Sequence, residues 1–222
     1  MKRYKFITIM LFFIFLFSIS CVSAMIKDYS LIGKVIYLDA GHGGIDSGTV
    51  SGHILEKDIN LVMVKKLEKE LVSRGAYVYL TRSDDNDLST SKNNRKRSDL
   101  KNRAYLINKS DCDIFISIHL NYFYDSKWKG LQIFYNDRNN NNKLIAEELT
   151  NYLKHELKNV RDYKYSSDYY LYKNIDKPGV LIELGFLSNP DDRYVLTKEE
   201  YQDKYVVSIV NSIESVFNKG FL

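Results

Sequence analysis

The chain is poor in cysteine, proline and glycine. Its 222 residues include 2 cysteines, 2 prolines and 11 glycines, and no segment repeats at a fixed period. This composition excludes a collagen-like helix and a solenoid. Because 45% of the residues are hydrophobic and 27% are charged, the chain is not a disordered tail either. Its length is sufficient for one domain with a sizeable hydrophobic core and is short for two independently stable domains.

A strong charge of one sign is also lacking. The formal net charge is +4, and three of the basic residues, Lys2, Arg3 and Lys5, lie among the first 24 residues, which hold no acidic residue. Residues 25–222 therefore carry 29 basic and 28 acidic side chains, a net charge of +1. A nearly neutral domain is not drawn electrostatically to nucleic acid, so we expect no nucleic-acid partner.

The N-terminal residues have the pattern of a secretion signal. The basic residues precede an apolar run from Phe6 to Phe17, in which only Thr8 is polar. This run is short for a bilayer span, and the small residues Val22-Ser23-Ala24 follow where signal peptidase cleaves. We expect residues 1–24 to be a signal peptide or an uncleaved N-terminal anchor. The protein is then exported, and it meets a membrane only through an uncleaved N-terminus.

Segments of strand type and helix type alternate along the rest of the chain. β-Branched and aromatic residues predict strands at 34–39, 76–80, 114–119, 131–135 and 180–183. Apolar residues at helical spacing predict helices between Leu55 and Gly75, over 98–108, from Asn142 to about 158, and over 199–217. The alternation predicts one α/β domain, with a twisted, mostly parallel or mixed sheet and helices on both faces. Ligands of such sheets bind beyond the carboxyl ends of the strands.

Side chains suited to metal chemistry follow the predicted strands. His42 lies in a glycine-rich turn after the first strand, and His119 and Glu183 end two later strands. Glu56 begins the first long helix. Two imidazoles and one carboxylate form the ligand set of a catalytic zinc ion, with a fourth position left for water. A second carboxylate nearby can act as a general base toward that water.

Each of these residues also has a plain structural interpretation. A histidine at a strand end is often only hydrogen-bonded, and Glu56 can simply complement the helix dipole. His53 is a rival metal ligand, whereas His155 lies among charged residues of a predicted helix and is expected on the surface. Glu183 is harder to explain, because an unpartnered buried carboxylate is costly. Spacing alone therefore leaves the metal site open.

Five sequence blocks, taken together, resemble the zinc-dependent N-acetylmuramoyl-L-alanine amidases of the amidase-3 family. They are VIYLDAGHGGIDSG, LEKDINL, RSDLKNRAYLIN, DIFISIHLN and PGVLIELGFLSNPDD, in the family's order. The resemblance implies a catalytic domain over residues 34–217, in which His42, Glu56 and His119 hold Zn²⁺. It implies that Glu183 is the catalytic carboxylate. The expected reaction is hydrolysis of the amide bond between N-acetylmuramic acid and L-alanine in peptidoglycan.

The resemblance also bears on location and partners. A short signal before a single catalytic domain resembles the branch of the family that acts in spore cortex maturation. We expect the protein to remodel the cell wall or the spore cortex. Its location is then the wall, the outer face of the membrane or the cortex space. Whether it needs an activating protein partner is left open by the sequence. Arg103 and Asn121 are candidates to orient the cleft, with packing as the alternative. A zinc peptidase that cuts within the stem peptide, or a non-catalytic peptidoglycan-binding module, stays open.

Overall fold

The computed structural model describes residues 7, 10–12, 29–167, 169 and 171–222. The chain divides into two units, Met1–Ser30 and Leu31–Leu222. Most of the first unit, including the expected cleavage site after Ala24, lies outside the described residues. None of the helices in the described part of the chain combines the length and the hydropathy needed to cross a bilayer.

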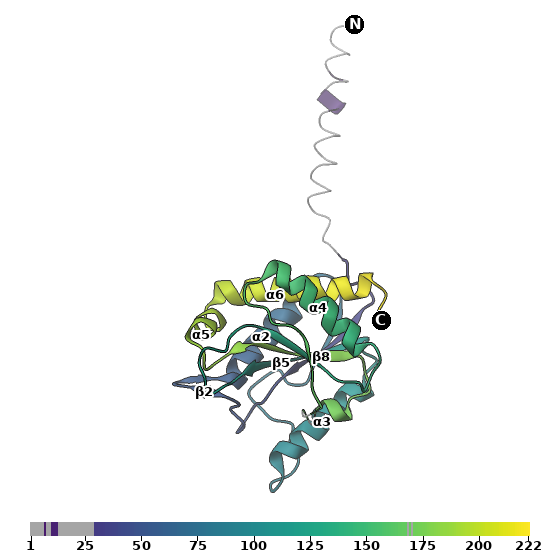
Figure 1. The fold of residues 1–222 in the computed structure, drawn as a ribbon. Coiled ribbons are helices and arrows are strands. Elements are labelled where there is room, and N and C mark those ends of the chain that lie inside the picture. The colour runs from purple at the N-terminus through teal and green to yellow at the C-terminus, as the bar shows by residue number, and fades with distance from the viewer. Residues whose placement is uncertain (1–6, 8–9, 13–28, 168, 170) are drawn as a thin grey trace. The chain divides into compact units, whose positions relative to one another are not determined.

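The second unit is an α/β domain around a six-stranded sheet of order β4-β1-β5-β8-β6-β7 (Figure 1). Its strands are β1 (Val35–Ala40), β4 (Tyr77–Leu80), β5 (Ile114–Asn121), β6 (Gln132–Tyr135), β7 (Lys164–Tyr165) and β8 (Gly179–Phe186). Strands β4, β1, β5 and β8 run parallel, whereas β6 pairs antiparallel with β8 and parallel with β7. The prediction of one α/β domain with a mixed sheet is confirmed.

Helices cover both faces of the sheet. The first core, on one face, lies under α2 (Glu56–Ser73), α4 (Asn142–Glu156) and α6 (Glu199–Asn218). The second core, on the other face, lies under α3 (Arg95–Lys109) and the 3₁₀ helix η1 (Tyr172–Asn174). Figure 1 shows α4 and α6 on one side of β5 and β8 and α3 on the other. Helix α3 starts three residues earlier than the predicted 98–108.

Four small elements were not predicted: strand β7, the 3₁₀ helix η1, a hairpin and one short helix. A hairpin of β2 (Val50–Ser51) and β3 (Ile54–Leu55) lies just before α2. Helix α5 (Pro190–Leu196) follows β8, and the Asn189 side chain caps it by accepting hydrogen bonds from two backbone N–H groups. Such short elements are specified by local hydrogen bonds, because they are too brief to show a hydrophobic period.

Alternation along the central strands divides their side chains between the two cores. Ile116 and Ile118 of β5 and Ile182 of β8 belong to the first core, under α2, α4 and α6. Phe115 and Leu181 point to the opposite face and belong to the second core, under α3. Because side chains in a strand alternate, the following residues of that second face are polar: Asp39 on β1, Ser117 and His119 on β5, and Glu183 on β8. The polar strand ends therefore share one face at the carboxyl edge of the sheet.

Candidate metal centre

The backbone places His42 in a conformation that few residues adopt. Its φ angle is +62°, within the turn that follows β1. The guanidinium of Arg103 donates one hydrogen bond to the His42 carbonyl, at 2.5 Å, and another to the Ala40 carbonyl, at 2.6 Å. Arg82 donates to the carbonyls of Ala40 and Gly41, at 2.9 and 3.1 Å. Two buried arginines thus hold three consecutive carbonyls of the turn and offset the cost of the left-handed residue.

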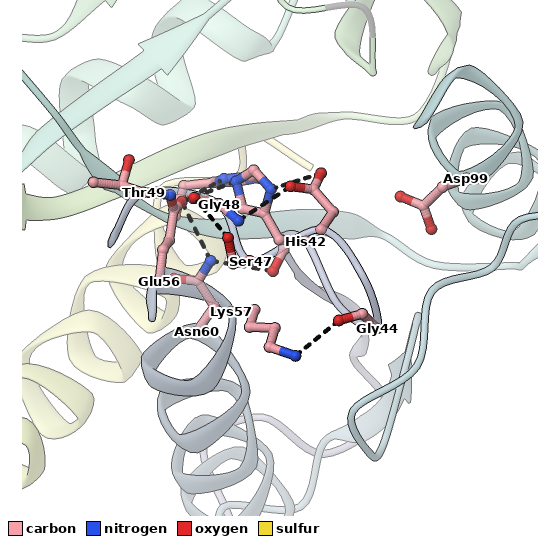
Figure 2. A network of polar contacts seen from close by, with 12 residues as sticks. His42, Gly44, Ser47, Gly48, Thr49, Glu56, Lys57, Asn60 and Asp99 are labelled. Carbon is pink, nitrogen blue, oxygen red and sulfur yellow. Dashed lines mark hydrogen bonds and ion pairs between the residues drawn. The ribbon is translucent and has the colours of Figure 1, made fainter. Parts of the chain in front are cut away.

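Glu56 joins the two histidines. It is the first residue of α2, is 2% exposed, and its Oε1 lies 3.1 Å from both His42 Nε2 and His119 Nδ1. Backbone N–H groups of Leu120 and Thr49 donate to Oε1 and Oε2, at 3.0 and 2.8 Å. Figure 2 shows His42, Glu56 and Thr49 converging on this point. One potential ligand atom from each of His42, Glu56 and His119 lies within 4.8 Å of the others.

The three side chains fit the requirements of a zinc ion. Imidazole nitrogen and carboxylate oxygen are zinc donors, and bonds of about 2.0–2.2 Å in a tetrahedron separate ligand atoms by roughly 3.4 Å. The two separations of 3.1 Å from Glu56 Oε1 are close to that spacing. Three protein ligands leave one position open, as in catalytic rather than structural zinc sites. The group can therefore hold a metal ion.

Two glycines make this close approach feasible. A Cβ atom on Gly41 would lie 2.2 Å from His119 Cε1, so no larger residue fits beneath the imidazole. A Cβ atom on Gly48, whose φ angle is +64°, would lie 2.6 Å from Glu56 Oε2 and 2.8 Å from His42 Cδ2. The glycine-rich segment after β1 thus lets the backbone pass against all three candidate ligands.

The charges of the cluster depend on one another. Burial opposes charging of the His42 imidazole, but hydrogen bonds to Asp46 and Glu56 outweigh burial and raise its pKa to about 9. The hydrogen bond from His42 Nδ1, at 3.0 Å, lowers the pKa of Asp46. Burial alone would raise the pKa of Glu56, yet hydrogen bonds to His119 and His42 lower it. The cluster therefore favours an anionic carboxylate that attracts positive charge.

Glu183 lies beside this cluster in a different environment. It is 5% exposed, and it stands opposite His119 in the register of β5 and β8. The Tyr169 hydroxyl donates to Oε1 at 3.3 Å, whereas Oε2 is buried and has no hydrogen-bond partner among the described residues. Burial raises the pKa of Glu183 to about 7. A carboxyl with such a pKa both accepts and releases a proton near neutral pH.

All four candidate residues open onto one cavity of about 550 Å³, which we call the metal cleft. Its other polar lining residues include Asp39, Asp46, Asp99 and Arg103. Asp39 is fully buried and accepts hydrogen bonds from Arg103 at 2.7 Å, Ser117 at 2.6 Å and Thr81 at 2.8 Å. Burial alone would raise the pKa of Asp39, but Arg103 and Ser117 outweigh it and lower the pKa. The floor of the cleft is thus a buried ion pair.

The structure separates the remaining sequence candidates. Arg103 holds the turn of His42, as described above. Asn121 lines a neighbouring cavity instead of the metal cleft. His53 is exposed in the turn between β2 and β3 and is outside the potential metal-binding group. His155 is exposed on α4, as expected.

Asp46 and Arg82, which act on the turn, were not among the residues predicted from the sequence. Asp46 binds the imidazole of His42 and lies four residues after it, so their short spacing in the sequence could have suggested the contact. Arg82 follows β4 and lies 40 residues from His42, so only the parallel pairing of β1 and β4 brings it to the turn. No local sequence pattern predicts that Arg82 contacts this turn.

Comparison with known proteins supports these observations. The sequence profile of the N-acetylmuramoyl-L-alanine amidase family matches residues 36–215. A germination-specific N-acetylmuramoyl-L-alanine amidase of Bacillus subtilis (strain 168) is 42% identical over 194 residues, covering 85% of this chain and 82% of that protein. The CwlD amidase of Clostridioides difficile, solved in complex with the GerS lipoprotein, is 40% identical. Its TM-score is 0.79, with 84% of this chain and 100% of that chain covered. An N-acetylmuramoyl-L-alanine amidase of Clostridium difficile 630 is 30% identical, with a TM-score of 0.75 over 84% of this chain and 98% of that chain.

Proposed function

The chain belongs to the N-acetylmuramoyl-L-alanine amidase family, and we propose that it works with one zinc ion held by His42, Glu56 and His119. As a member of this family it is an amide hydrolase of peptidoglycan, and the bond cleaved joins N-acetylmuramic acid to L-alanine. The donor types, their mutual distances and the burial of Glu56 support the ligand set. Asp46 holds Nδ1 of His42 and so directs Nε2 toward Glu56.

Glu183 is the proposed acid and base. A zinc ion held by His42, Glu56 and His119 would lower the pKa of a bound water toward neutrality and would polarise the scissile carbonyl. Glu183 takes a proton from the attacking water as the new C–O bond forms. It then delivers that proton to the L-alanine nitrogen as the C–N bond breaks. The observation that carries this assignment is a buried carboxyl beside His119, with one oxygen that has no partner among the described residues and a pKa raised by burial to about 7.

Location and partners are the finer part of the proposal. We assign residues 1–24 to a signal peptide or uncleaved anchor and residues 34–217 to the catalytic domain. The enzyme then acts outside the cytoplasm, in remodelling of the wall or spore cortex, which the germination-specific relative supports. A protein partner that activates the enzyme is proposed because the CwlD amidase was solved with a lipoprotein. N-terminal sequencing of the protein from cells tests cleavage after Ala24.

The bond cleaved and the metal are tested on one preparation. The purified protein, with zinc and with a chelator, is incubated with peptidoglycan, and the new ends are identified by mass spectrometry. We expect a free lactyl carboxyl and a free L-alanine amino group. Cleavage within the stem peptide contradicts the assigned bond and identifies a peptidase. Peptidoglycan binding with no product, in the presence of zinc and a protein partner, identifies a binding module.

The ligand set is tested by metal analysis, which does not depend on activity. His119→Ala is expected to lose zinc, because it removes one of three protein ligands. His53→Ala is the matched control, since His53 is exposed outside the potential metal-binding group, and it should bind zinc as the wild type does. Zinc bound at wild-type affinity by His119→Ala overturns the ligand set.

A further inference from the structure

A second cavity lies next to the metal cleft. It has a volume of about 530 Å³, and Tyr169 lines both cavities. We call it the Arg161 pocket; its walls include Phe123, Trp128, Gln132, Arg161, Lys164, Tyr165 and Phe186. Among the described residues that line it, two are cationic and none is acidic. The pocket is therefore suited to an anionic group attached to a partly apolar chain.

Strand register connects this pocket to Glu183. In the parallel pair of β5 and β8, His119 stands opposite Glu183. In the antiparallel pair of β8 and β6, Glu183 stands opposite Gln132. Directly opposite residues project from the same face of a sheet, so these three side chains form one row. Arg161 continues the row, because its Nε donates to Gln132 Oε1 at 3.3 Å.

The guanidinium of Arg161 is held in place by contacts that do not include a carboxylate of the described residues. Its Cζ lies 4.6 Å from the ring centroid of Trp128 and 5.6 Å from that of Phe186. Nη1 is 3.5 Å from the Lys129 carbonyl, and Nη2 has no hydrogen-bond partner among the described residues. The adjacent carboxylate of Asp162 is bound to Lys154. Stacked and pre-organised in this way, the guanidinium fork is suited to a carboxylate.

The proposed reaction determines which part of the substrate reaches this pocket. Glu183 delivers a proton to the leaving nitrogen, and it stands between His119 and Gln132 in the row. A peptide that leaves with that nitrogen on the side of Glu183 away from His119 would extend over β6 toward Arg161. Two strand spacings separate Glu183 from Arg161, roughly 10 Å. If the substrate forms a hydrogen bond of about 3 Å with each of these two side chains, one to two extended residues of the peptide span the distance that remains.

We propose that Arg161 binds the α-carboxylate of the second residue of the stem peptide, a glutamate linked through its γ-carboxyl. Trp128 forms the apolar wall on which this part of the peptide lies. This inference rests on the proposed function, because the position of Glu183 relative to the leaving nitrogen sets the direction of the peptide. Arg161 is thereby a specificity-determining residue that takes no part in proton transfer.

Peptide binding is tested by calorimetric titration, which is independent of turnover. The two probes are L-alanyl-γ-D-glutamate and the same dipeptide amidated at the α-carboxyl of its second residue. We expect the wild type to bind the free acid at least tenfold more tightly than the amide, since a charge-assisted bidentate contact is lost. Arg161→Gln is expected to abolish this preference, and Arg161→Lys to keep part of it. Equal affinity of the wild type for both probes overturns the proposal.

A matched arginine variant and a kinetic measurement separate the subsite from the chemistry. Arg138→Gln removes an exposed arginine that is paired with Asp176 and lines neither cavity, so it should keep the full preference. With muropeptide substrates, Arg161→Gln should raise KM for the free acid while kcat and zinc content stay near wild type. An enzyme that cleaves the amide bond but ignores amidation refutes the subsite alone. An enzyme that cleaves another bond refutes the proposed function, whatever the titration shows.

Discussion

Glu183 lies directly opposite His119 across the parallel strands β8 and β5. Their side chains project from the same face, at the edge where both strands end. His119 faces Glu56 at 3.1 Å, whereas Glu183 keeps one oxygen without a partner among the described residues. One register pair thus places a candidate metal ligand next to a candidate proton carrier, and the two functions can be separated by substitution.

Glu183→Gln tests this separation. The amide has the same size and keeps the Tyr169 contact, but it cannot accept a proton, so activity on peptidoglycan should fall by about 10²–10⁴-fold. Zinc content should remain that of the wild type, because Glu183 is outside the potential metal-binding group. Product release and metal content are measured on one sample. The control is Glu214→Gln, on α6, where the carboxylate pairs with Arg74. Near-normal turnover of Glu183→Gln contradicts the role.

Gly41→Ala tests the close approach of the turn to His119. The added Cβ would lie 2.2–2.6 Å from three atoms of the imidazole ring, which must then shift. We expect a loss of zinc affinity of at least tenfold, measured by competition with a chelator. Gly33→Ala is the control: no atom lies within 4 Å of its added Cβ, and its φ angle of +75° adds a backbone strain that Gly41, whose φ angle is not positive, does not bring. Equal losses in both variants would contradict the prediction, because the Gly33 variant does not crowd the imidazole.

Most of the site residues could be predicted because they stand at the ends of strongly apolar segments. His119 follows five consecutive buried residues of β5, and Glu183 follows four of β8. Periodicity identifies such strands, and the rule for ligand positions in parallel sheets brings their ends together. Glu56 was a candidate because it begins the first long helix, but its role as a metal ligand came from the family resemblance, since a carboxylate in the first turn of a helix also has an ordinary structural role.

The other features of the site depend on contacts between residues far apart in the sequence, which no local sequence pattern predicts. His53 was a rival metal ligand in the sequence, and the hairpin of β2 and β3 places it in solvent. The antiparallel direction of β6 was open, because a short apolar run reads the same either way. Gln132 stands beside Glu183 only because of that direction. The Arg161 pocket was therefore beyond sequence reasoning.

Arg103→Ala tests the buried ion pair beneath the turn. Arg103 is 1% exposed and Asp39 is 0% exposed, so the variant leaves an uncompensated buried carboxylate. Removing one partner of such a pair costs about 3–5 kcal/mol in the free energy of unfolding. Urea unfolding of the metal-free protein measures the loss. The control is Arg138→Ala, which breaks an exposed pair with Asp176 and should cost about 1 kcal/mol or less. A loss of that size in Arg103→Ala contradicts the predicted role.

The same ion pair predicts how stability depends on acid. Arg103 and Ser117 hold the pKa of Asp39 below its ordinary value, despite burial. The unfolded chain takes up a proton at Asp39 near pH 3.9 while the folded protein stays ionised, so this contribution is full above that pH and is lost below it. Unfolding free energies of the metal-free protein between pH 6 and pH 3 should therefore fall toward acid. Asp39→Asn lacks the titrating group, so its stability is lower at pH 6 but falls less steeply. The slope of unfolding free energy against pH is compared between the wild type and Asp39→Asn. Because both proteins contain the other carboxylates, the difference between the two slopes reports on Asp39. Equal slopes would mean that Asp39 has the same pKa in the folded and unfolded states, which is incompatible with a buried pair to Arg103.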